Sequence, residues 1–186
     1  MEEATTQLLG RAARGDHQAL EELVGFWQPR LHGLFLGLGA DPHQAEDLVQ
    51  ETLLRALEHL PRWQPRASFK TWLYHVALNL WRDQKRRAYG RHELLGGILP
   101  KNGADLANPP LDAAGQAERE AVRHALLSLP LAQREVLVLR FYQELSLEEI
   151  ARACRCSANT VKSRLRLALV KLRRELEAEH AQHEQE

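Results

Sequence analysis

The segment from Leu145 to Arg173 constrains the fold more than any other part of the sequence. Ser146 and Glu149 have the spacing of a capping box, which opens a short amphipathic helix. A turn at Cys154–Ser157 follows, and a second helix begins near Ala158. The apolar stripe expected on that second helix consists of Val161, Leu165, Ala168, Leu169, Leu172 and Leu176. The pattern predicts a helix-turn-helix, with a plain helical hairpin as the alternative.

The second helix of this pair has a polar face suited to duplex DNA. Opposite the apolar stripe, at helical spacing, lie Asn159, Lys162, Ser163 and Arg166. Arg or Lys can read guanine in a major groove, and Asn can read adenine. The residues better placed for phosphates are Arg155, Arg164, Lys171 and Arg173.

Good helix formers dominate the rest of the chain, which predicts an all-α fold. Asp16 can cap a helix that Pro29 should kink or interrupt. Asp41 and Pro42 begin another helix, whose apolar positions continue to Leu60 before Pro61. Ser68 caps a long helix that we expect to end near Gly90.

The composition changes after this helix. Residues 93–115 are rich in Gly and Pro and are expected to form a linker. Helices should resume near Asp112 and run to Ser128, then cover 132–142. The polar tail after Glu177 is expected to fray.

Positive charge is concentrated although the formal net charge is zero. Residues 152–174 hold eight basic residues and no acidic one. Residues 62–91 hold eight basic residues against the single acid Asp83. Such segments suit two polyanion contacts, with solvated helix faces as the alternative. Because ordinary surfaces mix both signs of charge, the alternative explains an acid-free segment poorly.

Aromatic residues interleave with basic ones between Phe69 and Arg87. This arrangement suits single-stranded nucleic acid, where bases stack on rings and cations follow phosphates. Trp72 lies on the apolar stripe and is expected in the core, whereas Tyr74 and Trp81 lie off it and could be exposed. Asn79, also off the stripe, could meet a base edge.

An acidic amphipathic helix is expected over 41–60. Its exposed acids beside an apolar stripe suit docking on a basic partner helix, with an ordinary solvated face as the alternative.

Several function classes find no support in the sequence. The longest apolar run is far shorter than the ~20 residues of a membrane span, and the acidic N-terminus is unlike a secretory signal. Two cysteines do not make a disulfide scaffold, so the cytoplasm is the expected compartment. Cys154 and Cys156 lack further ligands at zinc spacing, and the nine histidines are scattered. We therefore expect no enzyme, metal, cofactor or small-molecule substrate.

Four stretches of the chain resemble a known family, the extracytoplasmic-function (ECF) class of bacterial sigma factors. They are Arg14–Leu20, Ala45–Thr52, Ser68–Arg87, and Leu129–Ala151 together with Thr160–Arg164. Each motif is moderately specific, and their order and spacing together are highly specific. One departure is Leu167 before Ala168, where the family usually has Arg, which removes one DNA contact and leaves the −35 sequence open.

The resemblance implies two helical domains. Residues 1–92 would form the region 2 domain, 93–115 the linker, 116–178 the region 4 helix-turn-helix domain and 179–186 a polar tail. The linker would lead toward the polymerase active site. The partners implied are core RNA polymerase, promoter DNA and an anti-sigma factor, which is often tethered at the inner membrane face.

The resemblance also implies roles for matching residues. Core polymerase would be contacted by Asp47, Leu48, Gln50 and Glu51. The −10 element would be contacted by Arg62, Arg66, Ser68, Lys70, Tyr74, Asn79, Arg82, Arg86 and Arg87, with a non-template base flipped toward Asn79. The −35 duplex would be contacted by Arg155, Asn159, Thr160, Lys162, Ser163, Arg164 and Arg166. We expect promoter specificity to require polymerase, because a chain of zero net charge binds DNA weakly alone.

Two other functions remain as alternatives from the residues alone. A helix-turn-helix regulator without polymerase would bind duplex DNA by itself, but it leaves the acidic helix and the segment Phe69–Arg87 without a purpose. A helical adaptor would tolerate loss of the charges on Lys162 and Arg166.

Overall fold

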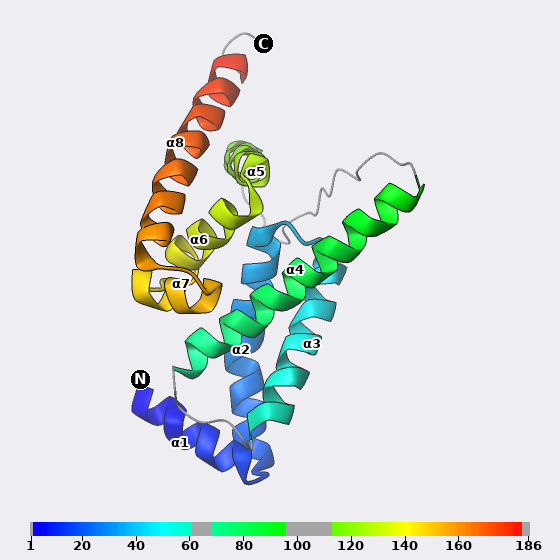
Figure 1. Cartoon of the computed structure of the whole chain (residues 1–186), viewed down its shortest axis with the longest axis vertical. Coiled ribbons are helices and arrows are strands. Elements are labelled where there is room, and N and C mark those ends of the chain that lie inside the picture. The colour runs from blue at the N-terminus through cyan, green and yellow to red at the C-terminus, as the bar shows by residue number, and fades with distance from the viewer. Residues whose placement is uncertain (1, 61–67, 96–112, 184–186) are drawn as a thin grey trace. The chain divides into compact units, whose positions relative to one another are not determined.

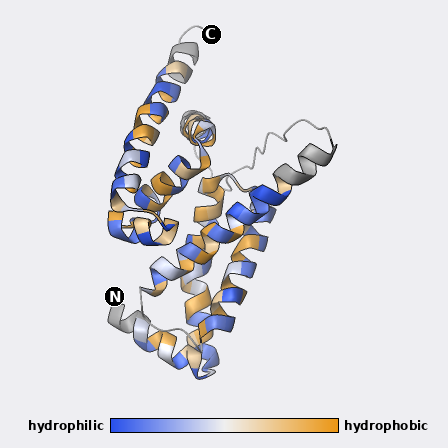
Figure 2. Cartoon of the chain, viewed as in Figure 1, coloured by the Kyte–Doolittle hydropathy of each residue, from blue (hydrophilic) through white to orange (hydrophobic). Residues whose placement is uncertain are grey.

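A computed structural model describes residues 2–60, 68–95 and 113–183 (Figure 1). These residues form eight helices and no strand, which confirms the all-α prediction. The helices are α1 (Glu2–Ala13), α2 (His17–Leu38), α3 (Pro42–His59), α4 (Phe69–Leu95), α5 (Ala113–Ser128), α6 (Leu131–Phe141), α7 (Leu147–Cys154) and α8 (Ala158–His183). The helices carry both hydrophilic and hydrophobic residues along their length (Figure 2), and an amphipathic helix turns the hydrophobic ones toward the core.

The helices form two compact units. The first contains α1, α2 as far as Phe35, α3 and α4, and the second contains α5 to α8 together with Leu36–Pro42. Two helical units agree with the two predicted domains. Most of the predicted linker, residues 96–112, lies outside the described residues, so the domain boundaries stay predictions.

The start of α2 shows how one acidic side chain organises a turn. Asp16 Oδ1 accepts the Ala19 N–H at 3.1 Å, and Asp16 Oδ2 accepts from Arg11 Nε at 2.7 Å. Gly15, at φ 85°, makes the tight turn that leads into this cap. The predicted cap at Asp16 is therefore confirmed.

Helix α2 continues through Pro29, so of the predicted kink or interruption the interruption is wrong, and the kink stays a prediction. An interior proline removes one backbone donor and its ring crowds the carbonyl of the preceding turn, which destabilises a helix without always ending it. The buried residues Leu31, Leu34 and Phe35 follow it directly, and their packing holds the helix together across the missing bond.

Helix α4 begins where predicted and is longer than predicted. Ser68 Oγ accepts the Thr71 N–H at 3.3 Å, which caps the first turn. The helix runs to Leu95 rather than ending near Gly90, because a single glycine costs helix stability without forbidding it.

The buried face of α4 includes two aromatic residues, Tyr74 and Trp81, that lie off the apolar stripe predicted from the sequence. Tyr74 is 1% exposed and Trp81 is 0% exposed, so the expectation that they are exposed is wrong. Tyr74 is buried because it packs against Trp27 of α2. The Trp27 ring makes edge contacts with Phe69 and Tyr74, at centroid distances of 5.9 and 6.0 Å. Trp72, expected in the core, is half-buried beside His59.

The core of the second unit lies at the end of α5, where residues of α6 and α8 pack against it. The core contains Leu126, Leu129, Leu137 and Ala168. Arg134 donates to the carbonyls of Leu127 and Leu129 at 2.6 and 3.0 Å, which satisfies acceptors that the end of α5 leaves over.

Helix α8 departs from the sequence expectation in two ways. It continues to His183, where the tail after Glu177 was expected to fray. Leu169, placed on the apolar stripe, is 45% exposed because the buried stripe of this helix centres on Val161 and Ala168.

Candidate nucleic-acid and partner surfaces

Helix α7 is fixed at its start by the predicted capping box. The backbone N–H of Ser146 donates to Glu149 Oε2 at 2.8 Å, and the Glu149 N–H donates to Ser146 Oγ at 3.2 Å. Two backbone donors at the start of the helix are thereby satisfied. This reciprocal pair sets the direction from which α7 enters the turn.

The turn between α7 and α8 is short and specific. Arg155 adopts the left-handed conformation at φ 53°, and the Cys156 N–H donates to the Ala151 carbonyl at 2.9 Å. Ser157 then caps α8 by accepting the Thr160 N–H at 3.0 Å. The result is the predicted helix-turn-helix, with α8 as the second helix.

The polar face of α8 is exposed. Among the predicted duplex-reading residues, the exposed ones are Arg155, Asn159, Lys162, Ser163 and Arg166. Val161 on the opposite side is fully buried, which fixes the rotation of the helix. The predicted face is therefore solvent-accessible and, between residues 152 and 174, carries no acidic residue.

Two residues of this set have structural contacts as well. Thr160 is half-buried, and its hydroxyl lies 2.8 Å from that of Ser157 in the cap. Arg164 is half-buried and approaches Cys156 Sγ at 3.8 Å. These two side chains therefore help to shape the start of α8.

Two residues expected to face phosphates are engaged elsewhere. Lys171 donates to the Ser128 carbonyl at 2.7 Å, and Arg173 pairs with Glu177 at 2.8 Å. This contact with Glu177 raises the pKa of Arg173 above its ordinary value. A carbonyl and a carboxylate thus already compete for these cations.

The predicted −10 residues are divided along α4. Lys70, Asn79 and Arg82 are half-buried, whereas Arg86 and Arg87 are exposed. Arg86 pairs with Asp83, the acid within this basic segment. Ser68 acts as the cap of α4, and Arg62 and Arg66 lie outside the described residues.

Tyr74 does not belong to an exposed stacking surface. Its ring is buried against Trp27, because α4 turns this position toward α2. No base can stack on a ring that is 1% exposed without the helix moving away. The ring is therefore not available for stacking in this conformation, and the contact of Tyr74 with −10 DNA stays a prediction.

Two features of α4 were missed from the sequence. His75 Nε2 lies 2.9 Å from Asn79 Nδ2, one helical turn away. Lys85 Nζ lies 4.3 Å from the centroid of the buried Trp81 ring, a cation–π contact. Their i, i+4 spacing was the available signal.

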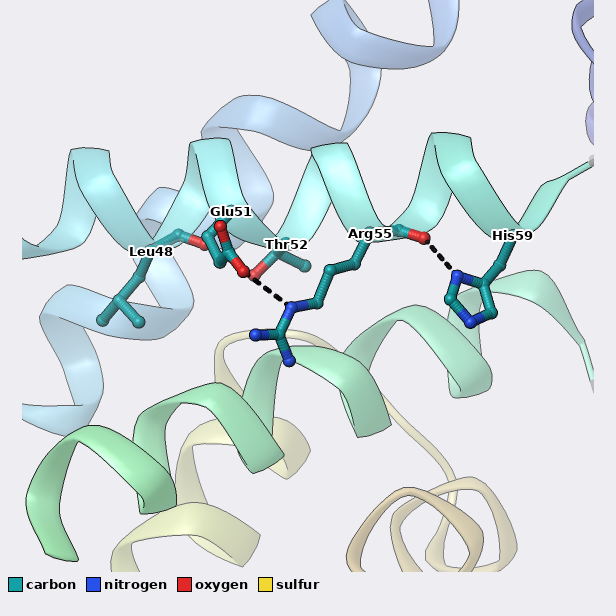
Figure 3. A network of polar contacts seen from close by, with 5 residues as sticks. All are labelled: Leu48, Glu51, Thr52, Arg55 and His59. Carbon is teal, nitrogen blue, oxygen red and sulfur yellow. Dashed lines mark hydrogen bonds and ion pairs between the residues drawn. The ribbon is translucent and has the colours of Figure 1, made fainter. Parts of the chain in front are cut away.

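The predicted polymerase-binding residues on α3 are unequal in exposure. Asp47 and Gln50 are exposed, and Glu51 is half-buried and pairs with Arg55 at 2.7 Å (Figure 3). Leu48 is only 6% exposed, so little of its side chain is available to a partner, and its contact with polymerase stays a prediction. It belongs to the apolar side of α3, where its carbonyl accepts from the buried Thr52 hydroxyl at 2.6 Å.

An exposed apolar residue on the same helix was missed. Leu54 is 57% exposed and lies one turn after Gln50, whereas Leu53 is half-buried. Its position off the apolar stripe was the signal. The accessible surface of α3 thus combines acidic, amide and apolar groups.

Metal and membrane sites find no support in the part of the chain that the structure describes. There, no cluster of three or more His, Cys, Asp or Glu residues could hold a metal ion. None of the helices searched is long and apolar enough to cross a membrane.

Family models match both units. Residues 23–91 match Sigma-70 region 2, and residues 119–172 match Sigma-70 region 4. The first range contains α3 and most of α4, and the second contains the helix-turn-helix. Each family match therefore covers most of one of the two helical units.

Curated relatives carry the same assignment. The ECF RNA polymerase sigma factor EcfG of Rhodopseudomonas palustris is 37% identical over 144 residues, 77% of each chain. The ECF RNA polymerase sigma factor SigW of Bacillus subtilis is 28% identical over 184 residues, which are 95% of this chain and 98% of SigW.

Solved structures share the fold. RpoE of Bartonella quintana, in complex with the anti-sigma factor NepR, gives a TM-score of 0.73 at 26% identity, over 84% of this chain and 96% of RpoE. CnrH, in complex with the cytosolic domain of CnrY, gives a TM-score of 0.70 at 26% identity, over 92% of this chain and 96% of CnrH. The chain belongs to the ECF sigma factors of the sigma-70 family, the proteins that direct RNA polymerase in transcription initiation.

Proposed function

We propose that this sigma factor directs core RNA polymerase to promoters whose −35 element is read as duplex DNA by α8. The exposed, acid-free face of α8 carries this proposal, because Asn159, Lys162 and Arg166 lie together opposite a buried Val161. Amide and guanidinium groups on one helix face match the base edges of a major groove. The role is binding rather than catalysis.

The second part of the proposal concerns the −10 element. Asn79 offers amide groups to a base edge, and Arg86 and Arg87 provide exposed cations further along α4. Flipping a base out of the stack costs a few kcal/mol, so contacts with polymerase must help to offset it. Because contacts with polymerase help to offset the free energy of base flipping, we expect the holoenzyme, rather than the sigma factor alone, to bind the −10 element specifically.

The third part is docking on core polymerase through α3. Asp47 and Gln50 are exposed, and Leu54 adds an apolar group to the same helix. Acidic and amide groups beside an apolar residue suit a basic helical partner. Glu51 reaches such a partner only by exchanging its contact with Arg55.

An anti-sigma factor is the further partner proposed. Among the solved structures of the same fold, the sigma factor RpoE is in complex with the anti-sigma factor NepR, and CnrH is in complex with the cytosolic domain of CnrY. By this analogy, an anti-sigma factor would hold the chain in the cytoplasm, at the inner membrane face where the factor is tethered.

In vitro transcription tests the function. Bacterial core polymerase receives genomic fragments with and without the protein, and RNA 5′ ends are sequenced. New start sites that share paired −35 and −10 motifs are expected. No new starts, together with tight duplex binding by the protein alone, would support a regulator that acts without polymerase.

The matched control for this experiment makes the same loss of charge at another exposed position of the same helix. Arg166→Ala removes a cation from the exposed face, whereas Arg174→Ala removes one from the same helix two turns later. Only the first substitution should alter the −35 motif among the new start sites. Equal effects of both would indicate a nonspecific electrostatic contribution.

A further inference from the structure

The side chains of His75 and Asn79 form a hydrogen-bonded pair on α4. Asn79 Nδ2 lies 2.9 Å from His75 Nε2, and both residues are half-buried. Positions four apart in a helix lie on the same face, one turn above the other. The pair therefore sits on the same helix face that carries Asn79 toward DNA in the proposed function.

The amide nitrogen of Asn79, rather than its carbonyl oxygen, faces the imidazole of His75. An amide nitrogen only donates, so His75 Nε2 accepts and the hydrogen of the neutral ring is on Nδ1. The carbonyl oxygen of Asn79 is consequently turned away from the imidazole. Asn79 presents a hydrogen-bond acceptor, rather than its amino group, to a group that approaches from the other side.

Cationic residues follow Asn79 along the same helix. Arg82 and Arg86 follow Asn79 at i+3 and i+7, so they lie on the same face of α4. Exposure increases along this face, from the half-buried Asn79 and Arg82 to the exposed Arg86. A base that meets Asn79 can therefore have its phosphates near cations.

We propose that His75 is a positioning residue that orients the Asn79 amide, so that the flipped base of the −10 element is selected for an amino group. Among the bases, adenine N6 and cytosine N4 donate to a carbonyl oxygen, whereas thymine O4 and guanine O6 accept. The preferred base is therefore adenine or cytosine. This inference rests on the proposed function, because it assumes that Asn79 contacts the melted −10 strand.

The substitutions at position 75 separate orientation from simple packing. His75→Gln keeps an acceptor that can hold Asn79 Nδ2 in place. His75→Leu removes the partner and lets the amide turn. His75→Lys supplies only donors, so it attracts the Asn79 carbonyl and turns the amino group toward the base.

The experiment uses reconstituted holoenzyme and a promoter selected by the genomic transcription assay. Each non-template position of its −10 element is changed to all four bases, and transcript yield is measured. The wild-type protein should favour adenine or cytosine over thymine by about fivefold or more at one position. Asn79→Ala should abolish the preference at that position and identify it as the base in question.

The variants then give distinct results. Glutamine should keep the preference, leucine should reduce it to less than about twofold, and lysine should shift it toward thymine or guanine. His17→Leu, on the exposed start of α2, is the matched histidine control and should match the wild-type protein. The glutamine and lysine variants keep a long polar side chain, so they decide the question if the leucine variant does not fold.

Two kinds of result would overturn the inference. Wild-type selection of thymine or guanine at the Asn79-dependent position contradicts the acceptor orientation. An unchanged base profile in both the leucine and lysine variants contradicts the role of His75, even though transcription itself succeeds. Failure of the wild-type protein to direct any initiation would instead remove the proposed function on which the inference rests.

Discussion

Lys171 of α8 donates to the backbone carbonyl of Ser128, the last residue of α5, at 2.7 Å. The lysine thereby places a positive charge at a helix C-terminus, where backbone carbonyls lack intrahelical partners. The contact joins residues 43 positions apart in the chain. It therefore links the helix that reads DNA in the proposed function to the helix that begins the second unit.

Lys171→Met tests whether this contact is structural. Loss of an exposed charge-assisted hydrogen bond should lower the free energy of unfolding of the second unit by about 1 kcal/mol or less. The base preference at the −35 element should not change. Hydrogen exchange of α5 and α8 amides in the full chain measures the first effect, and transcription from −35 variants measures the second. A lost −35 preference without faster exchange would assign Lys171 to DNA instead.

Ser146→Ala should weaken the start of α7. Removing one half of the capping box costs about 1 kcal/mol. All four tryptophans lie before residue 82, so their fluorescence reports the first unit, whereas circular dichroism reports both. The urea midpoint should fall by circular dichroism and not by fluorescence. Ser163→Ala, at an exposed position of α8, is the control. It should leave the fluorescence midpoint in place and leave or slightly raise the circular dichroism midpoint, because alanine favours a helix more than serine does.

Local sequence signals predicted the starts of these helices well, because a capping side chain makes its hydrogen bond to the backbone within its own turn. Asp16, Ser68 and Ser146 each accept a backbone N–H three residues ahead, as their side chains and positions indicated. The helix-turn-helix followed from the same logic. Errors arose where tertiary packing decides the outcome. Tyr74 is buried because Trp27, far away in the sequence, packs against it, and Pro29 is accommodated by the apolar residues after it.

The candidate site was predictable to a similar extent. Exposure of Asn159, Lys162 and Arg166 followed from the period of the apolar stripe. Side-chain pairing did not, because several partners lie within reach of each long side chain. Lys171 donates to the carbonyl of Ser128, although it was expected to face DNA phosphates. Glu51 pairs with Arg55, although it was expected to contact core polymerase.

Asp16→Asn should alter how the stability of the first unit depends on pH. Hydrogen bonds from Arg11 and from the Ala19 N–H hold the pKa of the Asp16 carboxyl below its ordinary value. A depressed folded-state pKa contributes stability above the ordinary value, and that stability is lost as the pH falls through the acid range. The variant should therefore be less stable near neutrality and lose less stability on acidification. Tryptophan fluorescence during urea unfolding at several pH values measures this, and parallel curves for the two proteins would contradict it.

Asp47→Ala and Arg55→Ala should have different effects on binding to core polymerase. Asp47 is exposed, and in the proposed function its carboxylate meets a basic helix, so its removal should weaken binding and increase the sensitivity of the complex to competitors. Arg55 restrains Glu51 through their 2.7 Å ion pair, so its removal should leave binding unchanged or strengthen it. Competition against a second sigma factor for limiting core polymerase measures both. Weaker binding by Arg55→Ala would show that the ion pair itself, rather than a released Glu51, forms the docking surface.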